Sequence, residues 1–156
     1  MVGNEERVIK RMLESSYKYI DYWVIQCNGT DKTQSIIEEF YKEKKIPGFT
    51  YNHEWDYPGI NRDHTLQTAL KSNHGCDWIL RMDADEQLEV DDDFDWTILD
   101  HKDIESFNVT ATGAGSIYFR TWLWNANIPW RFEHDRRHEC VYICLLYTSP
   151  SPRDSC

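Results

Sequence analysis

Short apolar runs alternate with segments of helical periodicity through the first half of the chain. The helical segments repeat apolar residues three and four positions apart, as amphipathic helices do. The short runs are β-prone and are bounded by turn residues. The alternation predicts strands at 22–25, 49–51 and 78–82 and helices at 5–17, 33–45 and 61–72. Strands and helices in this order favour the α/β class, with a mostly parallel sheet and helices on both faces.

The second half of the chain has a different pattern. Two longer β-prone stretches, 106–112 and 116–124, lie on either side of Gly113-Ala114-Gly115. A glycine-rich link between two strands is typical of a hairpin. We therefore expect a small antiparallel extension of the sheet.

The charge balance and the hydropathy pattern limit the partners. Lys and Arg number 17 against 27 Asp and Glu, which gives a formal net charge of -10. This excess argues against a nucleic acid as a general partner, and an anionic ligand needs a local basic residue or a metal. No stretch approaches the roughly 20 apolar residues that span a bilayer, and the start MVGNEERVIK is too polar for a signal peptide. We expect no transmembrane segment and a cytoplasmic location.

The last residues change in character. From Cys144 the chain reads CLLYTSPSPRD, in which Ser and Pro alternate and no core-facing periodicity remains. This stretch resembles a translated sequencing-library adapter, and a natural Ser/Pro-rich linker is the alternative. We expect a domain at 1–143 followed by a non-native tail at 144–156.

The most informative local feature is the stretch RMDADEQ, residues 81–87, directly after an apolar strand. Asp83, Asp85 and Glu86 crowd three carboxylates together, which costs free energy unless a positive charge lies among them. Two aspartates separated by one small residue can present oxygen ligands to a hard divalent cation. The alternative is a solvated acidic turn that caps the next helix. An EF-hand loop is excluded, because Leu88 stands where that loop needs glycine.

Five motifs occur in an order that resembles the family 2 glycosyltransferases of the GT-A fold. They are NEERVIKRMLES, NGTDKTQSIIEEF, Trp55 with GINR at 59–62, DWILRMDADEQL, and RRHE at 136–139. The resemblance covers roughly residues 2 to 140 and implies a GT-A-like, Rossmann-type domain. It also implies a nucleoside-diphosphate sugar donor, with Asp83 and Asp85 holding Mn²⁺ or Mg²⁺ on the diphosphate. The positive charge that the acidic stretch requires is then this cation.

The resemblance assigns further residues to the donor. It places Asn4, Glu5 and Asp31 near the nucleoside and brings Arg62 to the diphosphate through its forked donors. An ordinary surface salt bridge is the alternative for Arg62. Gln26 stands where many relatives carry an acidic residue, and it can hydrogen-bond a base or ribose without offering charge. Asn4 is also a candidate N-cap of the first helix.

The RRHE motif carries the expected catalytic residues. By the resemblance, His138 is a third metal ligand or a phosphate contact, and Glu139 is the base that deprotonates an unknown hydroxyl acceptor for inverting displacement. Asp135 and Glu133 compete for the role of base. The spacing of His134 and His138 also fits a zinc site, although no clear third ligand accompanies them.

Two other functions stay open from the sequence. A nucleotidyltransferase on a similar sheet needs a glycine-rich basic loop at the N-terminus, which NEER does not supply. A non-catalytic carbohydrate or divalent-cation module predicts metal binding without nucleotide, whereas a transferase predicts that each tightens the other. Family members usually have an apolar strand before NEE, and only Met1-Val2-Gly3 precede Asn4 here. Together with the tail, this suggests a fragment cut at both ends.

Overall fold

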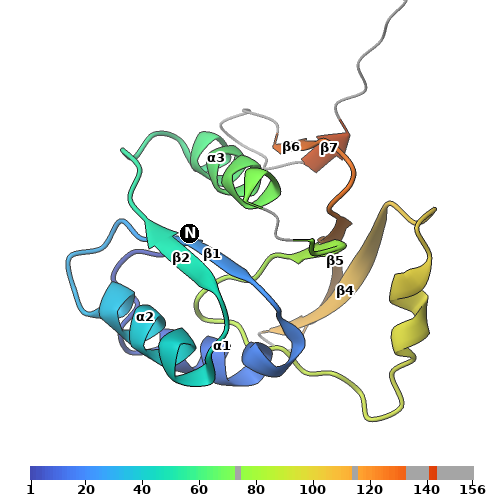
Figure 1. Ribbon diagram of the computed structural model, residues 1–156, viewed down its shortest axis with the longest axis horizontal. Helices are drawn as coiled ribbons and strands as arrows, with labels where there is room; N and C mark the ends of the chain where they lie inside the picture. The colour runs from blue at the N-terminus through green and yellow to red at the C-terminus, as the bar shows by residue number, and fades with distance from the viewer. Residues whose placement is uncertain (73–74, 114–115, 133–140, 144–156) are drawn as a thin grey trace, which may run out of the picture.

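The computed structural model describes residues 1–72, 75–113, 116–132 and 141–143, which form a mixed α/β fold (Figure 1). The helices are α1 (Ile9–Ser16), α2 (Thr33–Lys44) and α3 (Pro58–Lys71), with the 3-10 helices η1 (Tyr17–Tyr19) and η2 (Trp96–Asp100). The strands are β1 (Trp23–Gln26), β2 (Gly48–Tyr51), β3 (Trp78–Leu80), β4 (Ser106–Gly113), β5 (Ser116–Asn125), β6 (Trp130–Phe132) and β7 (Val141–Ile143). The predicted α/β class is confirmed, and every predicted helix and strand overlaps an observed one.

The parallel part of the fold consists of β1, β2 and Val2. Trp23 pairs with Gly48 at one end of the β1–β2 ladder and Gln26 with Tyr51 at the other. Val2 forms a parallel bridge with Cys27, donating to the carbonyl of Gln26 at 2.7 Å and accepting from the amide of Asn28 at 3.0 Å. The strand expected before Asn4 is thus represented by Val2. The carboxyl ends of Val2, β1 and β2 lie at one edge, where ligands of parallel sheets collect.

The antiparallel part holds more strands than the parallel part. One sheet has the order β3-β5-β4, and β6 pairs with β7. The central strand β5 pairs with β3 through Ile79 and Trp124 and with β4 along its length. The hairpin predicted from Gly113-Ala114-Gly115 therefore supplies the strand that continues beside β3.

Helices cover both faces of the β1–β2 pair. In Figure 1, α3 lies on one side of this pair and α1 and α2 lie on the other. Two apolar clusters fill the spaces between these layers. The first joins α1, α2 and β1 and includes Ile9, Leu13, Trp23, Ile37, Phe40 and Tyr41. The second joins α3, β5 and β6 through Leu66, Trp122, Trp124, Trp130 and Phe132.

The predicted N-cap of the first helix is wrong. The helix begins at Ile9, its N-cap position is Val8, and no side chain caps it. The Asn4 side-chain oxygen instead accepts hydrogen bonds from the amides of Thr30 and Asp31. A long-range partner has therefore replaced the local one that the spacing suggested.

Some predictions concern other parts of the chain. The tail at 144–156 and the RRHE motif lie outside the described residues. Among the described residues, no helix combines the length and apolar character that crossing a bilayer requires. The cytoplasmic location and the foreign origin of the tail stay predictions.

Candidate functional site

The acidic loop, residues 81–88, is anchored between the two parts of the fold. The Arg81 amide donates to the carbonyl of Trp122 at 2.9 Å, which extends the β3–β5 pairing by one residue. Ala84 is buried in the α1–α2–β1 apolar cluster. Leu88 donates its amide to the Ser15 hydroxyl at 2.9 Å. Because Ala84 faces the core, the aspartates on either side of it are presented at the rim of the sheet.

The loop also folds back on itself. The Asp83 amide donates to a carboxylate oxygen of Glu86 at 2.8 Å, and the Glu86 amide donates to the Asp83 carbonyl at 3.1 Å. Burial raises the pKa of the Glu86 carboxyl, the negative charges of Asp83 and Asp85 raise it further, and the positive charge of Arg120 opposes them. The two aspartates and Glu86 are therefore within electrostatic reach of one another.

Arginines supply the positive charge that the acidic loop requires. Arg81 donates through Nη2 to both carboxylate oxygens of Asp83, at 3.2 and 3.3 Å. The Arg81 side chain is 17% exposed and that of Asp83 is 36% exposed, so water screens this pair only in part. Burial lowers the pKa of the Arg62 guanidinium, the charges of Arg81 and Arg120 lower it further, and Asp83 raises it.

A buried tryptophan holds two of these arginines. The guanidinium carbon of Arg81 lies 5.3 Å from the centroid of the Trp122 ring, and that of Arg120 lies 4.7 Å from it. Guanidinium groups at this distance are attracted by the aromatic quadrupole. Trp122 belongs to the apolar cluster under α3, so it orders both side chains at the surface of the sheet.

The residues predicted near the nucleoside come together at a second place. A hollow of about 490 Å³ is lined by Asn4, Glu5 and Asp31 together with Glu6, Arg7, Val8 and Thr30. The Asp31 carboxylate accepts hydrogen bonds from the amides of Thr33 and Glu6 at 3.0 and 3.1 Å. Hydrogen bonding, chiefly from Thr33, lowers the pKa of this carboxyl, so it is ionised at neutral pH.

The N-terminal segment lies between the hollow and the acidic loop in the chain's electrostatic surroundings. Burial lowers the pKa of the Met1 amino group, and the charges of Asp83, Arg81 and Arg62 also act on it. Asn4, which lines the hollow, follows three residues later. Three residue steps span at most about 11 Å. The N-terminal segment therefore runs from the surroundings of the acidic loop to the hollow.

Gln26 lies inside the protein rather than at the ligand edge. Its side chain is 0% exposed. Its amide nitrogen donates to the side-chain oxygens of Asn28 and Asn61, both at 3.0 Å. Its oxygen accepts from the hydroxyls of Thr65 at 3.0 Å and Tyr51 at 3.4 Å. The Thr65 hydroxyl also reaches the carbonyl of Asn61 at 2.9 Å, and that of Tyr51 also reaches the His64 ring at 3.3 Å, so each single hydroxyl proton is shared. Gln26 therefore joins α3 to β1 from inside the protein.

The Gln26 network also fixes Asn61, a buried residue that was not predicted from the sequence. Asn61 is also 0% exposed, and it directly precedes Arg62 on α3. Fixing Asn61 on β1 therefore fixes the start of the Arg62 side chain over the sheet edge. The signal in the sequence was the pair Asn61 and Thr65, two polar residues one helical turn apart that share a face.

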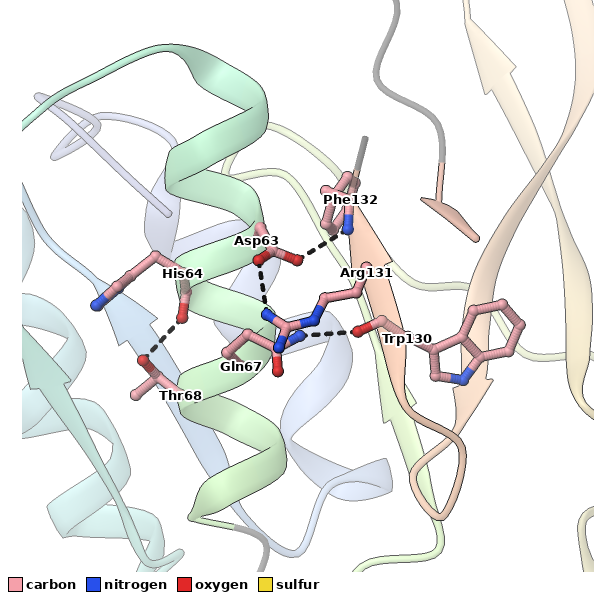
Figure 2. A network of polar contacts seen from close by, with 7 residues as sticks. All are labelled: Asp63, His64, Gln67, Thr68, Trp130, Arg131 and Phe132. Carbon is pink, nitrogen blue, oxygen red and sulfur yellow. Dashed lines mark hydrogen bonds and ion pairs between the residues drawn. The ribbon is translucent and has the colours of Figure 1, made fainter. Parts of the chain in front are cut away.

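A second polar network joins α3 to β6, and Figure 2 shows it from close by. The buried Asp63 carboxylate accepts from the Arg131 guanidinium at 3.1 Å and from the Phe132 amide at 2.9 Å. Gln67 donates to the carbonyl of Trp130 at 2.8 Å. The chain that enters residue 133 is thereby fixed against the helix that carries Arg62.

The remaining predicted residues divide into two groups. Asp85 is exposed on the acidic loop. Four candidates, Glu133, Asp135, His138 and Glu139, lie outside the described residues, and so does His134 of the alternative zinc site. Among the described residues, no group of three or more His, Cys, Asp or Glu side chains is placed to hold a metal ion.

Comparison with known proteins adds one finding. The sequence model of a family described as Glycosyl transferase family 2 matches residues 2–98, which is more than half of the 156 residues. The matched range includes the hollow, Arg62 and the acidic loop, and it ends before β4. No curated protein matches the chain.

Proposed function

The chain belongs to glycosyl transferase family 2, and from this membership we propose that it moves a sugar from a nucleoside-diphosphate donor to a hydroxyl acceptor with the help of a divalent cation. The supporting observation is that the matched residues 2–98 contain both the hollow lined by Asn4, Glu5 and Asp31 and the acidic loop, where the Asp83 carboxylate accepts from Arg81. This arrangement lies at the carboxyl edge of the strands, where a nucleotide can extend across the sheet.

The residues of the acidic loop fit Mg²⁺ or Mn²⁺. Such a cation needs only one or two carboxylates, because phosphate and water oxygens complete its coordination shell. Asp83 and Asp85 provide these carboxylates, so a closed cage of protein ligands is not required. When bound, the cation supplies Lewis-acid stabilisation of the leaving diphosphate. His138 is the proposed additional contact to the cation or the phosphates.

The hollow is the proposed nucleoside site. Two oxygen positions of the Asp31 carboxylate accept backbone amides, and an ionised carboxylate offers about four such positions. Asp31 can therefore also accept hydrogen bonds from ribose hydroxyls. Asn4 and Glu5 line the same hollow, and Asn4 orders the loop at Thr30 and Asp31. We leave Gln26 out of the proposed contacts because its hydrogen bonds are internal.

The remaining chain residues position the diphosphate and the acceptor. Arg62 presents a planar fork of donors that suits phosphate oxygens. Glu139 or Asp135 is the proposed base that takes the proton of the acceptor hydroxyl, in an inverting displacement.

Calorimetric titration of the chain with UDP or GDP in the presence of Mn²⁺ tests the proposal. The variant Asp83→Asn with Asp85→Asn is expected to lose at least about 100-fold in nucleotide affinity, because removing buried or bridging charge contacts typically costs about 3 kcal/mol. The matched control is Asp91→Asn with Asp93→Asn, which has the same spacing on an exposed acidic segment. This control is expected to leave the affinity unchanged.

Two outcomes of this titration would contradict the proposal. One is unchanged nucleotide affinity in the Asp83 and Asp85 variant. The other is Mn²⁺ binding by the unsubstituted chain without any binding of UDP or GDP, which would favour a cation-binding module instead.

A further inference from the structure

Charged side chains of both signs gather around the acidic loop, and we call them the charged cluster. Its positive groups are Arg62, Arg81 and Arg120, and its negative groups are Asp83, Asp85 and Glu86. The balance differs from the rest of the chain, which carries a formal net charge of -10. The Met1 amino group, whose pKa is lowered by burial, also interacts with Asp83, so the charges around the loop largely compensate one another.

The balance has a consequence for ligand binding. A divalent cation that takes the carboxylates leaves the arginines without counter-charge, and a diphosphate that takes the arginines leaves the carboxylates without theirs. Uncompensated charges are costly where water screens them only in part. A cation and a diphosphate that bind together avoid both costs. The cation then compensates the carboxylates, and the diphosphate compensates the arginines.

Arg81 is the residue that links the two halves. It forms an ion pair at 3.2 Å with Asp83, the predicted cation ligand. Both hydrogen bonds to Asp83 come from the same nitrogen, Nη2, so releasing Asp83 breaks contacts at one atom only. The backbone of Arg81 stays fixed by its bond to Trp122, and its guanidinium lies over the Trp122 ring. The side chain can thus change partner without moving its strand.

We propose that Arg81 is an exchangeable counter-ion: it pairs with Asp83 in the absence of ligand and moves to a phosphate oxygen of the donor when Asp83 binds the cation. Arg120, which shares the Trp122 ring, contacts the same diphosphate. The inference rests on the proposed function, since it takes a nucleoside diphosphate and a divalent cation as the ligands. It gives a role to Arg81, which lies in the DWILRMDADEQL motif but has no assigned contact there, and to Arg120, which lies outside the five motifs.

Binding titrations with Mn²⁺ alone, UDP alone and both together test the exchange. In the unsubstituted chain, each ligand is expected to tighten the other by about tenfold or more, a coupling within the usual range. Arg81→Gln is expected to bind Mn²⁺ alone about tenfold more tightly, because the carboxylate no longer has an internal competitor. In the same variant, the coupling between Mn²⁺ and UDP is expected to fall below about threefold.

Two further variants separate the exchange from a structural effect. Arg120→Gln is expected to weaken UDP binding by about tenfold, which is the scale of one charge-assisted hydrogen bond, and to leave the affinity for Mn²⁺ alone unchanged. Arg11→Gln, at an exposed position of α1, is the matched control and is expected to change neither affinity. Circular dichroism of each variant shows that it is folded, so a gain of Mn²⁺ affinity in Arg81→Gln reports on the Asp83 carboxylate.

Unchanged or weakened Mn²⁺ affinity in Arg81→Gln would overturn the exchange. Inorganic pyrophosphate in place of UDP distinguishes this failure from a failure of the proposed function. If Mn²⁺ couples to pyrophosphate but the chain binds neither UDP nor GDP, the donor assignment fails and the exchange is supported. If Mn²⁺ couples to neither pyrophosphate nor nucleotide, the exchange is overturned as well.

Discussion

Two polar clusters follow strands of this protein, and they differ in charge and burial. The cluster around Gln26, at the end of β1, is neutral, Gln26 and Asn61 at its centre are fully buried, and its hydrogen bonds are all internal. The cluster around Asp83, beyond β3, is charged and partly exposed. A neutral, satisfied network offers nothing to a ligand, whereas partly exposed ion pairs can exchange their partners. The Gln26 cluster therefore stabilises the fold, and the Asp83 cluster is the candidate binding site.

The two clusters are connected through α3. Asn61 belongs to the buried network, and the next residue, Arg62, belongs to the charged one. A rigid network that fixes a helix also fixes the charged side chain beside it, as a preorganised binding site requires. Substitutions in the buried cluster should therefore affect stability first, and substitutions in the charged cluster should affect binding first.

The largest expected effect on stability is that of Gln26→Met. Methionine has a similar length but removes the hydrogen bonds to Asn61, Thr65 and Tyr51, and it leaves these polar groups inside the protein. We expect a loss of about 2–4 kcal/mol in the free energy of unfolding, measured by urea denaturation. Gln87→Met, at an exposed position, is the control and should change this free energy little.

The Gln26→Met variant also tests whether the two clusters have separate roles. If the variant keeps its stability but loses affinity for UDP, then Gln26 contacts the ligand after a rearrangement. The division into a structural and a chemical cluster would then be wrong.

A smaller effect is expected for Asp63→Ala, which tests a charged network that we class as structural. Alanine removes the ion pair with Arg131 and leaves the buried Phe132 amide without its acceptor. The expected loss is about 2 kcal/mol in the free energy of unfolding, most of it from the unsatisfied amide. Asp63→Asn retains an acceptor for that amide and should lose only about half as much. Equal losses for the two variants would show that the amide contact contributes nothing.

The smallest effect is expected for Glu86→Gln, and its sign sharpens the contrast between the clusters. Burial raises the pKa of Glu86 above its ordinary value of 4.5, so the folded chain binds this proton more tightly than the unfolded chain does. The stability associated with this shift is fully present below pH 4.5 and is lost as the pH rises through the folded pKa. Glutamine imitates the protonated form, so the variant should be more stable than the unsubstituted chain at pH 7, by less than about 1 kcal/mol because water screens the group.

Thermal unfolding at pH 7 and at pH 4 measures this difference. The gain in stability from Glu86→Gln should be present at pH 7 and should shrink as the pH approaches 4. A variant that is less stable than the unsubstituted chain at pH 7 would show that the negative charge of Glu86 is needed to balance the arginines.

Much of the fold follows from local patterns in the sequence. The periodicity of apolar residues predicted α1, α2 and α3, and the β-prone runs predicted β1 to β5 close to their observed bounds. The acidic loop was predicted to follow a strand, and it does. Asn4 shows the limit of such reasoning, because its side chain has a partner in a distant loop that competes with the local cap.

The place of Arg120 in the charged cluster could not be predicted, because it depends on strand register, whereas Arg62 was expected at the diphosphate and Arg81 is only two residues from Asp83 in the sequence. Arg120 and Arg81 both lie over the Trp122 ring because of the register between β5 and β3. In this register Leu80 pairs with Leu123, and the Arg81 amide donates to the carbonyl of Trp122. A shift of one residue in this register would turn these side chains to the other face of the sheet. The burial of Gln26 likewise depends on how α3 packs on β1. The family resemblance assigned the positive charge at the acidic loop to a bound cation, and the structure places arginines there as well.

The most direct test of the central claim is a crystal structure of the chain with UDP and Mn²⁺. Our account predicts that Mn²⁺ contacts the Asp83 carboxylate, that the diphosphate contacts Arg62 and Arg120, and that Arg81 has moved from Asp83 to a phosphate oxygen. A nucleotide bound elsewhere, or an intact pair of Arg81 and Asp83 beside the bound diphosphate, would contradict it.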